Sequence, residues 1–429
     1  YVKKFVNLIL IIMNLTIFIK NILEIINPWN NIKILNKNIK VDVISGITVA
    51  IIALPLALAF GKNSGLGPVA GIIGAISGGI MGGLFGGSLV SVSGPTAPTS
   101  SQISAFMAAY VISTSNPEDL TAIFSIIFLS GLIMVAISIL KISKYIHYIP
   151  NTVVSGFMCG IGILVIISQL NDFLGFDFMK FNQNNNYQNL YVSLPSIIIL
   201  LSWSFFKQKL GFFKHVPAPF ITLIIGTGIA FFFNLNIPLI GSQMQTTSGT
   251  DLFSNFYIPD LNKMIQFIIP AFTLAGLIII DSLLTCVIAD NLTEKRHISD
   301  KETFGQGIAN MTSGMMGGTS TATATMFTVS NIKSGGNTPL SSIVYGLTLL
   351  AILLGLKSLV AAIPIACIAA ILIKVGFDII DYRFISIIKK ISNFEFIIFI
   401  TVLLVTIFYD IMLAVSVGVL LSFIKNFRN

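Results

Sequence analysis

A single charged residue interrupts one of the long apolar runs of this sequence. Asp281 is the only acidic or basic residue between Leu274 and Ala289, a stretch that otherwise has the composition of a membrane-spanning helix. A charged side chain at that depth is costly, and such residues usually lie on ion or substrate pathways. We therefore expect a functional role for Asp281, such as the binding of a cation or a proton. The alternative is an aspartate that only pairs with another helix or faces a wet crevice.

Two stretches rich in glycine, serine and threonine, residues 82–99 and 313–330, have matching patterns. Each contains a Gly-Gly pair, then an extended Ser/Thr-rich run, then a helical stretch. Pro95 and Pro98 prevent a continuous helix through the first, so we expect a short strand leading into a half-helix in each stretch. The strands could pair with one another or face a ligand, and the positive ends of the half-helices would bind an anion through backbone amides. Alternatively, the small residues serve only close helix packing.

Composition places these residues in a membrane. Hydrophobic residues make up 55% of the 429 residues, charged residues make up 10%, and the mean hydropathy is +0.91. These values exclude an ordinary soluble domain and predict an all-α polytopic membrane protein with about fourteen crossings. The predicted crossings are residues 41–61, 68–87, 95–111, 120–140, 151–170, 190–206, 217–235, 264–289, 303–316, 323–332, 340–355, 358–375, 394–408 and 411–424.

The net charge of +8 is explained by a membrane better than by nucleic acid. If the segment before Val41 is cytoplasmic, the basic clusters all fall in loops on that same side, as the positive-inside rule requires. Both termini are then cytoplasmic, and residues 1–40 form a cytoplasmic segment with an interfacial helix between Phe5 and Ile26. The basic clusters are Lys141 and Lys144; Lys207, Lys209 and Lys214; Lys295, Arg296 and Lys301; Lys389 and Lys390; and Lys425 and Arg428.

The cysteines and histidines form no catalytic or metal-binding pattern. No His-Glu-x-x-His or Gly-x-Ser-x-Gly string occurs, so the sequence does not predict an enzyme, and no cofactor is expected besides a coupling ion. The cysteines read as core residues of apolar segments, and the histidines lie at segment ends. These residues are Cys159, Cys286 and Cys367, and His147, His215 and His297.

The second half of the chain repeats features of the first. Transporters often consist of two repeats whose matching helices are broken near the middle of the bilayer. Here repeat one covers about residues 41–235 and repeat two about residues 264–424, within a transmembrane domain of residues 41–429. The helix predicted from Asp42 to Ala59 occupies the position in repeat one that the Asp281 helix occupies in repeat two.

Several short strings, in this order, resemble one known family. They are Ala53 to Gly61, Gly65 to Pro68, Val92 to Pro98, Ile280 to Thr285, Ala289 to Asn291, Ala324 to Met326, Asn331 to Lys333, and Gly335-Gly336. This sequence resembles the SulP anion transporters, and within that family it is most similar to the sodium-dependent bicarbonate transporters of cyanobacteria. The resemblance extends from about Val41 to Phe423.

The resemblance implies an architecture. SulP proteins have fourteen segments in two inverted seven-segment repeats, divided into a core and a gate domain, with short strands and half-helices at segments three and ten and the substrate between those segments. It also implies a homodimer in a bacterial plasma membrane. Family members usually continue into a cytoplasmic STAS domain, and this sequence ends before one would begin, so we expect no STAS domain within it.

The resemblance also implies ligands, position by position. The sodium ligands would be Asp281, Thr285 and Thr325, and the full cation site adds Thr323 and Ala324. Thr323 stands where a glycine is expected. The anion site is predicted to be lined by Ser93, Gly94, Thr96, Ala97, Ala324, Thr325 and Met326. Hard oxygen ligands suit sodium, although a proton on Asp281 would balance the same charge.

One difference from the family concerns charge. Many SulP exchangers carry an arginine at the start of segment ten, whereas this chain has Met326 and Phe327 there and no Lys or Arg before Lys333. An anion would then depend on the half-helix ends and on a co-bound cation, which is the physics of a symporter. The sequence thus predicts a secondary transporter of a small inorganic anion, most simply a sodium-coupled bicarbonate symporter. The alternatives are a proton-coupled sulfate or dicarboxylate symporter, a nucleobase permease, and an anion exchanger or channel.

Overall fold

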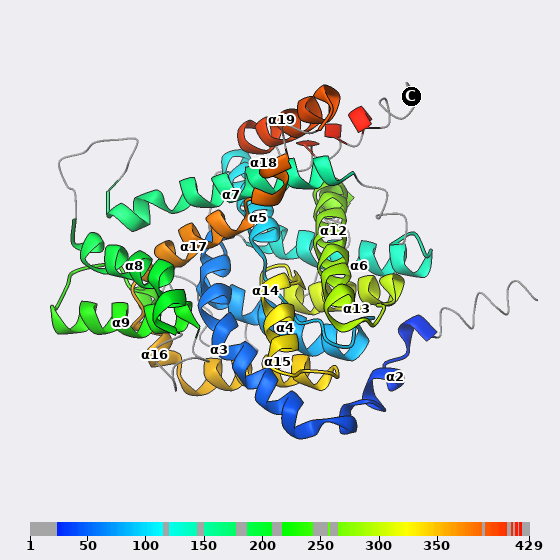
Figure 1. Ribbon diagram of the computed structural model, residues 1–429, viewed down its shortest axis with the longest axis horizontal. Coiled ribbons are helices and arrows are strands. Elements are labelled where there is room, and N and C mark those ends of the chain that lie inside the picture. Colours follow the sequence, from blue (N-terminus) through cyan, green and yellow to red (C-terminus); the bar gives the residue numbers. More distant parts are fainter. Residues whose placement is uncertain are drawn as a thin grey trace, which may run out of the picture.

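The computed structural model is a mainly helical molecule (Figure 1). It describes residues 24–114, 120–143, 150–176, 187–207, 217–242, 256–257, 265–387, 391–409, 413–414, 417–418 and 420–422. The predicted interfacial helix between Phe5 and Ile26 lies almost entirely outside these residues, as does most of the predicted crossing at 411–424.

Most predicted crossings correspond to a helix with nearly the same bounds. In the first half these are α3 (Ile39–Asn63), α4 (Pro68–Phe85), α5 (Ala97–Thr114), α6 (Thr121–Ile139), α7 (Asn151–Leu174), α8 (Leu190–Lys207) and α9 (Ala218–Phe232). In the second half they are α12 (Ile268–Thr293), α13 (Ser299–Met315), α14 (Thr325–Lys333), α15 (Leu340–Gly355) and α19 (Asn393–Phe408). Shorter elements are α2 (Trp29–Ile32), η1 (Leu35–Lys37), η3 (Tyr187–Asn189), η5 (Ile265–Phe267) and α18 (Tyr382–Ile387).

Five of the described helices are long and apolar enough to cross a membrane. They are Ile39–Asn63, Pro68–Phe85, Thr121–Ile139, Thr152–Leu174 and Ile268–Thr293. Three shorter apolar helices, Ala218–Phe232, Leu340–Gly355 and Asn393–Phe408, add to them. Long apolar helices satisfy every internal backbone hydrogen bond, which is what a bilayer requires of a spanning segment.

The predicted crossing at 358–375 is wrong as a single helix. It consists of α16 (Lys357–Ala361) and α17 (Ile365–Ile379). Pro364 lies between them; it has no N–H to donate and disfavours helical geometry in the preceding residue. Residues 238–240 form backbone hydrogen bonds with the break: Ile365 N donates to Pro238 O at 3.0 Å, and Ile240 N donates to Ile363 O at 2.9 Å.

Two short strands pair with one another. β1 (Ser93–Gly94) and β2 (Ala322–Thr323) are antiparallel, with Ser93 opposite Thr323 and Gly94 opposite Ala322. This confirms the expectation of an extended run before each helical stretch, and it shows that the two runs pair with one another. All four strand residues are buried, so the pairing satisfies backbone groups that water cannot reach.

The helices pack in two groups. The first helix group consists of α3, α4, α6, α12, α13 and α15, and it holds β1, β2, α5 and α14. The second helix group consists of α7, α8, α9, α17 and α19. Figure 1 shows α8 and α9 on the side of the molecule away from α6, α12 and α13. The groups meet where α3 contacts α9 and α17 and where α5 contacts α7.

Close packing inside the first helix group depends on glycine. A Cβ on Gly71 would lie 1.9 Å from Ala57 O, and one on Gly61 would lie 2.5 Å from Gly71 N. No side chain fits at these distances, so the small residues of α3 and α4 are what allow the two backbones to touch.

Candidate functional site

The paired strands bring the starts of two helices together. β1 precedes α5, which begins at Ala97, and β2 precedes α14, which begins at Thr325. Ala324 N donates to Val92 O at 3.0 Å and so extends the strand contact towards α14. Each helix start has backbone N–H groups without a partner inside the helix and carries a partial positive charge. Two such ends beside one strand pair form an arrangement that suits a small anion.

Asp281 faces the first of these helix starts. It lies within α12, and its Oδ2 accepts a hydrogen bond from Thr96 Oγ1 at 2.7 Å. Thr96 Oγ1 also lies 3.1 Å from Thr99 Oγ1, in the first turn of α5. The carboxylate predicted to bind a cation therefore lies directly beside a residue predicted to bind the anion.

Thr285 faces the second helix start. Its Oγ1 lies 2.7 Å from Thr325 Oγ1, at the first residue of α14. Because Asp281 and Thr285 are one turn apart on α12, the same helix face contacts both helix starts. The structure thus brings together Asp281 with Thr96 and Thr285 with Thr325.

Thr323 and Ser93 direct their hydroxyls elsewhere, to a second polar cluster on α13. Thr323 Oγ1 donates to Glu302 Oε1 at 2.6 Å, and Gln306 Nε2 donates to Ser93 Oγ at 2.6 Å and to Thr323 Oγ1 at 2.9 Å. The hydroxyl of Thr323 is therefore engaged by Glu302 and Gln306. Its backbone N–H donates to Ser282 Oγ on α12 at 3.1 Å, which keeps the residue next to the Asp281 helix.

The remaining predicted anion-site residues differ in exposure. Ala97 and Ala324 are buried, at the starts of their helices, whereas Met326 is 46% exposed. Gly94 is packed tightly: a Cβ there would lie 2.8 Å from Tyr345 Oη and 2.9 Å from Phe327 Cε2. Phe327 is 1% exposed and its ring centroid lies 5.9 Å from that of Tyr345. Of the adjacent residues Met326 and Phe327, Met326 is therefore the one with an exposed side chain.

Glu302 and Gln306 were not predicted as site residues. With Asn310 they form a stripe of polar residues spaced by four along α13, and all three are buried. Asn310 Nδ2 donates to Thr321 O at 2.7 Å and its Oδ1 accepts from Thr321 N at 2.9 Å, just before β2. The spacing of four along this helix was the available signal, because such residues share one helix face.

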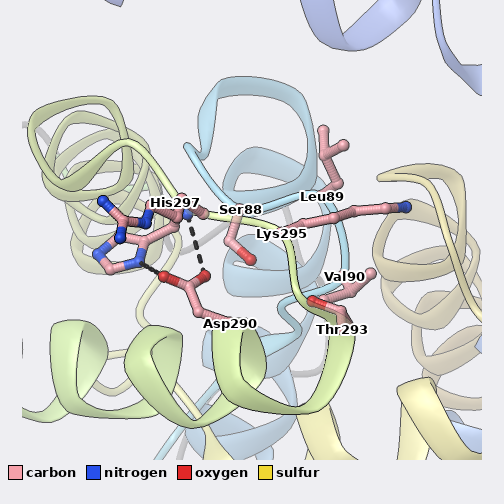
Figure 2. A pocket seen from close by; sticks show the side chains of 8 residues that line it. Ser88, Leu89, Val90, Asp290, Thr293, Lys295 and His297 are labelled. Carbon is pink, nitrogen blue, oxygen red and sulfur yellow. Dashed lines mark hydrogen bonds and ion pairs between the residues drawn. The ribbon is translucent and has the colours of Figure 1, made fainter.

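Figure 2 shows a pocket between the C-terminal end of α12 and residues 88–90, which lead into β1. His297 Nδ1 lies 2.7 Å from Asp290 Oδ2, and His297 N donates to Asp290 Oδ1 at 3.0 Å. These contacts fix the connection between α12 and α13. The pocket is lined by Ser88, Leu89, Val90, Asp290, Thr293, Lys295, Arg296 and His297, none of which was predicted to bind the substrate or the cation.

A transition-metal site is not indicated. Among the described residues, no group of three or more His, Cys, Asp and Glu side chains could hold a metal ion. A cation at Asp281 would have a single carboxylate supplemented by hydroxyl and carbonyl oxygens. Such hard oxygen donors suit sodium rather than zinc or copper.

Comparisons with known proteins identify related transporters. A model of the sulfate permease family matches residues 39–402. The bicarbonate transporter BicA of Picosynechococcus sp. is 39% identical over 403 residues, which cover 91% of this chain and 70% of that protein.

Two solved structures share the fold. The transmembrane domain of a cyanobacterial bicarbonate transporter, BicA, aligns with a TM-score of 0.78 at 34% identity and covers 88% of this chain and 98% of that chain. The structure of SLC26A9 aligns with a TM-score of 0.77 at 17% identity, over 91% of this chain and 65% of that one, and supports the fold alone. With the family match and the 39% identical relative, these findings show that the chain is a membrane transporter belonging to the sulfate permease family.

Proposed function

We propose that this protein is a sodium-coupled symporter of bicarbonate. The observation that carries the proposal is the position of Asp281. Its carboxylate accepts a hydrogen bond from Thr96 at 2.7 Å, and Thr285 on the same helix contacts Thr325 at 2.7 Å. Carboxylate and hydroxyl oxygens for a cation therefore lie next to two helix starts that suit an anion.

The charges of the site favour joint binding. Lys333 is the first basic residue of α14, at its far end, so α14 itself supplies no side-chain cation at its start. An anion beside Asp281 would meet a negative charge unless a cation were bound there. Each ion therefore improves the site for the other, and such coupling is reciprocal by thermodynamic necessity. Bicarbonate as the anion is supported by the 39% identical relative, which is a bicarbonate transporter.

The proposal includes an architecture. The two strand-and-helix breaks support two inverted seven-segment repeats with fourteen segments in all, repeat one at about 41–235 and repeat two at about 264–424. The two helix groups would be the parts that move relative to one another during transport. A homodimer with cytoplasmic termini in a bacterial plasma membrane completes the proposal.

A proton-coupled sulfate symporter is the second candidate. It is consistent with the hydrogen bond between Thr96 and Asp281, because that hydroxyl can bond to a carboxylate or to a protonated carboxyl group. In that case Thr285 and Thr325 would not be ligands, and their contact would serve helix packing.

Uptake into proteoliposomes separates the candidates. Purified protein is reconstituted with sodium or proton gradients imposed separately, and labelled bicarbonate and sulfate are offered in turn. The proposal expects bicarbonate accumulation that requires inward sodium and persists when the proton gradient is collapsed. Accumulation of sulfate with protons alone would replace it with the second candidate.

A further inference from the structure

Glu302 is a buried carboxylate that no part of the proposed mechanism uses. It lies in the first turn of α13 and is 1% exposed. It forms no ion pair within the described part of the chain, and its neighbour Lys301 donates instead to Asn31 Oδ1 at 2.7 Å. A buried charge without a countercharge is costly unless its oxygens accept several hydrogen bonds.

Four hydrogen bonds reach this carboxylate from both halves of the chain. Oε2 accepts from Gly87 N at 2.8 Å and from Ser88 N at 3.0 Å, in the loop that leads into β1. Oε1 accepts from Thr323 Oγ1 at 2.6 Å, on β2, and from Gln306 Nε2 at 3.1 Å. One side chain thus joins the break of the first half to the break of the second.

The backbone of this region is shaped so that α13 can approach the loop. A Cβ on Gly86 would lie 3.0 Å from Glu302 Oε2, and one on Gly87 would lie 2.7 Å from Glu302 N. A Cβ on Gly305 would lie 2.6 Å from Gly86 N. Glycine at these three positions makes the contact between the carboxylate and the loop amides possible.

Gln306 carries the connection to the first strand. Its Nε2 contacts Ser93 Oγ and Thr323 Oγ1, the two residues that face one another in the strand pair. Thr323 lies two residues before α14, and Ser93 lies shortly before α5. The pair Glu302 and Gln306 therefore fixes both strands immediately before the helix starts that face the proposed ions.

We propose that Glu302 is a positioning residue for transport: through Thr323 and Gln306 its carboxylate sets how the two helix starts converge on the ion sites. The proposal rests on the proposed function of that site. This role requires a side chain at position 302 that only accepts hydrogen bonds, because the four groups that bond to Glu302 are all donors. A glutamine of the same size would present an N–H group to at least one of them.

Sodium binding to the purified, intact protein provides the test. Sodium that binds only the folded state stabilises it by RT ln(1 + [Na⁺]/Kd), so a fit of Tm across a sodium chloride series gives the binding midpoint, the concentration equal to Kd, with choline chloride as the blank. We expect Glu302→Gln to raise this midpoint, and the bicarbonate midpoint at saturating sodium, at least about tenfold. Glu294→Gln, an exposed carboxylate just after α12, is the matched control and should leave both midpoints unchanged.

An exchange of the two side chains supplies a rescue. In Glu302→Gln combined with Gln306→Glu, the carboxylate at 306 can accept from Ser93 and Thr323, while the amide at 302 still accepts from the loop. We expect the exchange to return both midpoints to within about threefold of wild type, whereas Gln306→Glu alone places two carboxylates together and impairs binding. A folded Glu302→Gln protein with wild-type midpoints would overturn the proposal, as would an exchange that restores folding without restoring affinity.

If Glu302→Gln does not fold, Gln306→Met tests the link through Gln306, because it removes the amide contacts to Ser93 and Thr323 and leaves Glu302 bonded to the loop amides and to Thr323. Raised midpoints support the proposal, and unchanged midpoints refute it. If the anion stabilises the wild-type protein but sodium does not, the proposed sodium coupling is wrong, but the role of Glu302 is still tested. The effect of Glu302→Gln on the anion midpoint then decides that role.

Discussion

At the scale of single residues, Asp281 is the side chain on which the proposed coupling depends. Asp281→Asn retains the volume of the side chain and an oxygen that can accept from Thr96, but it removes the charge. Loss of one member of a buried charge pair costs about 2–5 kcal/mol, so sodium affinity should fall at least about 30-fold. Sodium-driven uptake of labelled bicarbonate by proteoliposomes measures the effect.

The control for this variant is Asp378→Asn. Asp378 is paired with Lys374 on α17 at 2.5 Å and is 45% exposed, so its loss should leave uptake near the wild-type rate. Equal uptake by well-inserted Asp281→Asn and wild-type proteins would mean that the coupling ion binds elsewhere.

Met326 offers a place to supply the missing positive charge. It is the second residue of α14 and is 46% exposed, whereas the adjacent Phe327 is 1% exposed and packed on Tyr345. An arginine at 326 would keep its charge accessible at the start of α14, while an arginine at 327 would bury its charge. Met326→Arg should give the anion a permanent countercharge and weaken its dependence on sodium.

The measurement is anion affinity across a sodium series. Coupled sites commonly change one another's affinity by about 5–150-fold, and we expect this factor to fall below about threefold in Met326→Arg. Met326→Gln, which is polar but uncharged, should keep the wild-type factor. Wild-type binding that is independent of both sodium and pH would instead indicate an exchanger or a channel.

At the scale of the elements, β1 has no room for a side chain at Gly94. A Cβ there would lie 2.8 Å from Tyr345 Oη and 2.9 Å from Phe327 Cε2. Gly94→Ala should therefore destabilise the fold by about 1–3 kcal/mol and lower anion affinity by displacing β1. The second substitution Tyr345→Phe removes one of the two clashing atoms and should recover part of both losses.

Thermal unfolding and anion binding of the four proteins in this cycle check the prediction. The buried Tyr345 hydroxyl has no hydrogen-bond partner among the described residues, so Tyr345→Phe alone should be nearly neutral. Gly228→Ala on α9 is the matched control, because nothing lies within 4 Å of its Cβ position. A Gly94→Ala protein as stable and active as Gly228→Ala would show that β1 tolerates displacement.

Much of this architecture could be predicted from the sequence. Apolar run length located the helices, and Pro95 with the Gly-Gly pairs located the two breaks, because both are local properties of the chain. The division at Pro364 was missed because its flanking residues are apolar enough to resemble one span. Glu302 was missed because its contacts come from Gly87, Ser88 and Thr323, and contacts between distant segments leave no local pattern.

At the scale of the whole molecule, the two helix groups meet in a polar contact at the end of α3. Lys62 on α3 pairs with Asp172 on α7. The adjacent Asn63 accepts from Ser168 Oγ at 3.2 Å, and its Nδ2 donates to Ser101 Oγ on α5 at 3.3 Å. The contact therefore joins α7 to the same helix whose start faces Asp281.

This contact should hold the helix groups in the arrangement seen here. If transport moves one group against the other, Lys62→Gln or Asp172→Asn should shift the population towards the arrangement in which they separate. The exchanged pair, Lys62→Asp with Asp172→Lys, should shift it back. Partly exposed ion pairs are worth about 1 kcal/mol or less, so the expected change in population is up to about fivefold.

The labelling rate of a cysteine placed at Ser101 reports the separation, after replacement of the three buried native cysteines. We expect faster labelling in each single variant and a wild-type rate in the exchanged pair. Lys374→Gln, which breaks an ion pair within one helix, should label at the wild-type rate. If the single variants do so as well, this pair has no part in opening the molecule.

The pairing of the strands also cannot form until the second half of the chain has been synthesised. Val92 N donates to Thr328 Oγ1, 236 residues further along the chain, and Ala324 N donates back to Val92 O. At about 5–20 residues per second, a ribosome needs on the order of ten to fifty seconds to synthesise the intervening segment. During that interval the first broken segment carries unsatisfied backbone groups inside or near the bilayer, where each is costly. The nascent first half is therefore a natural client for insertion factors that shield polar backbone, and arrest of translation before Thr328 should leave it open to degradation.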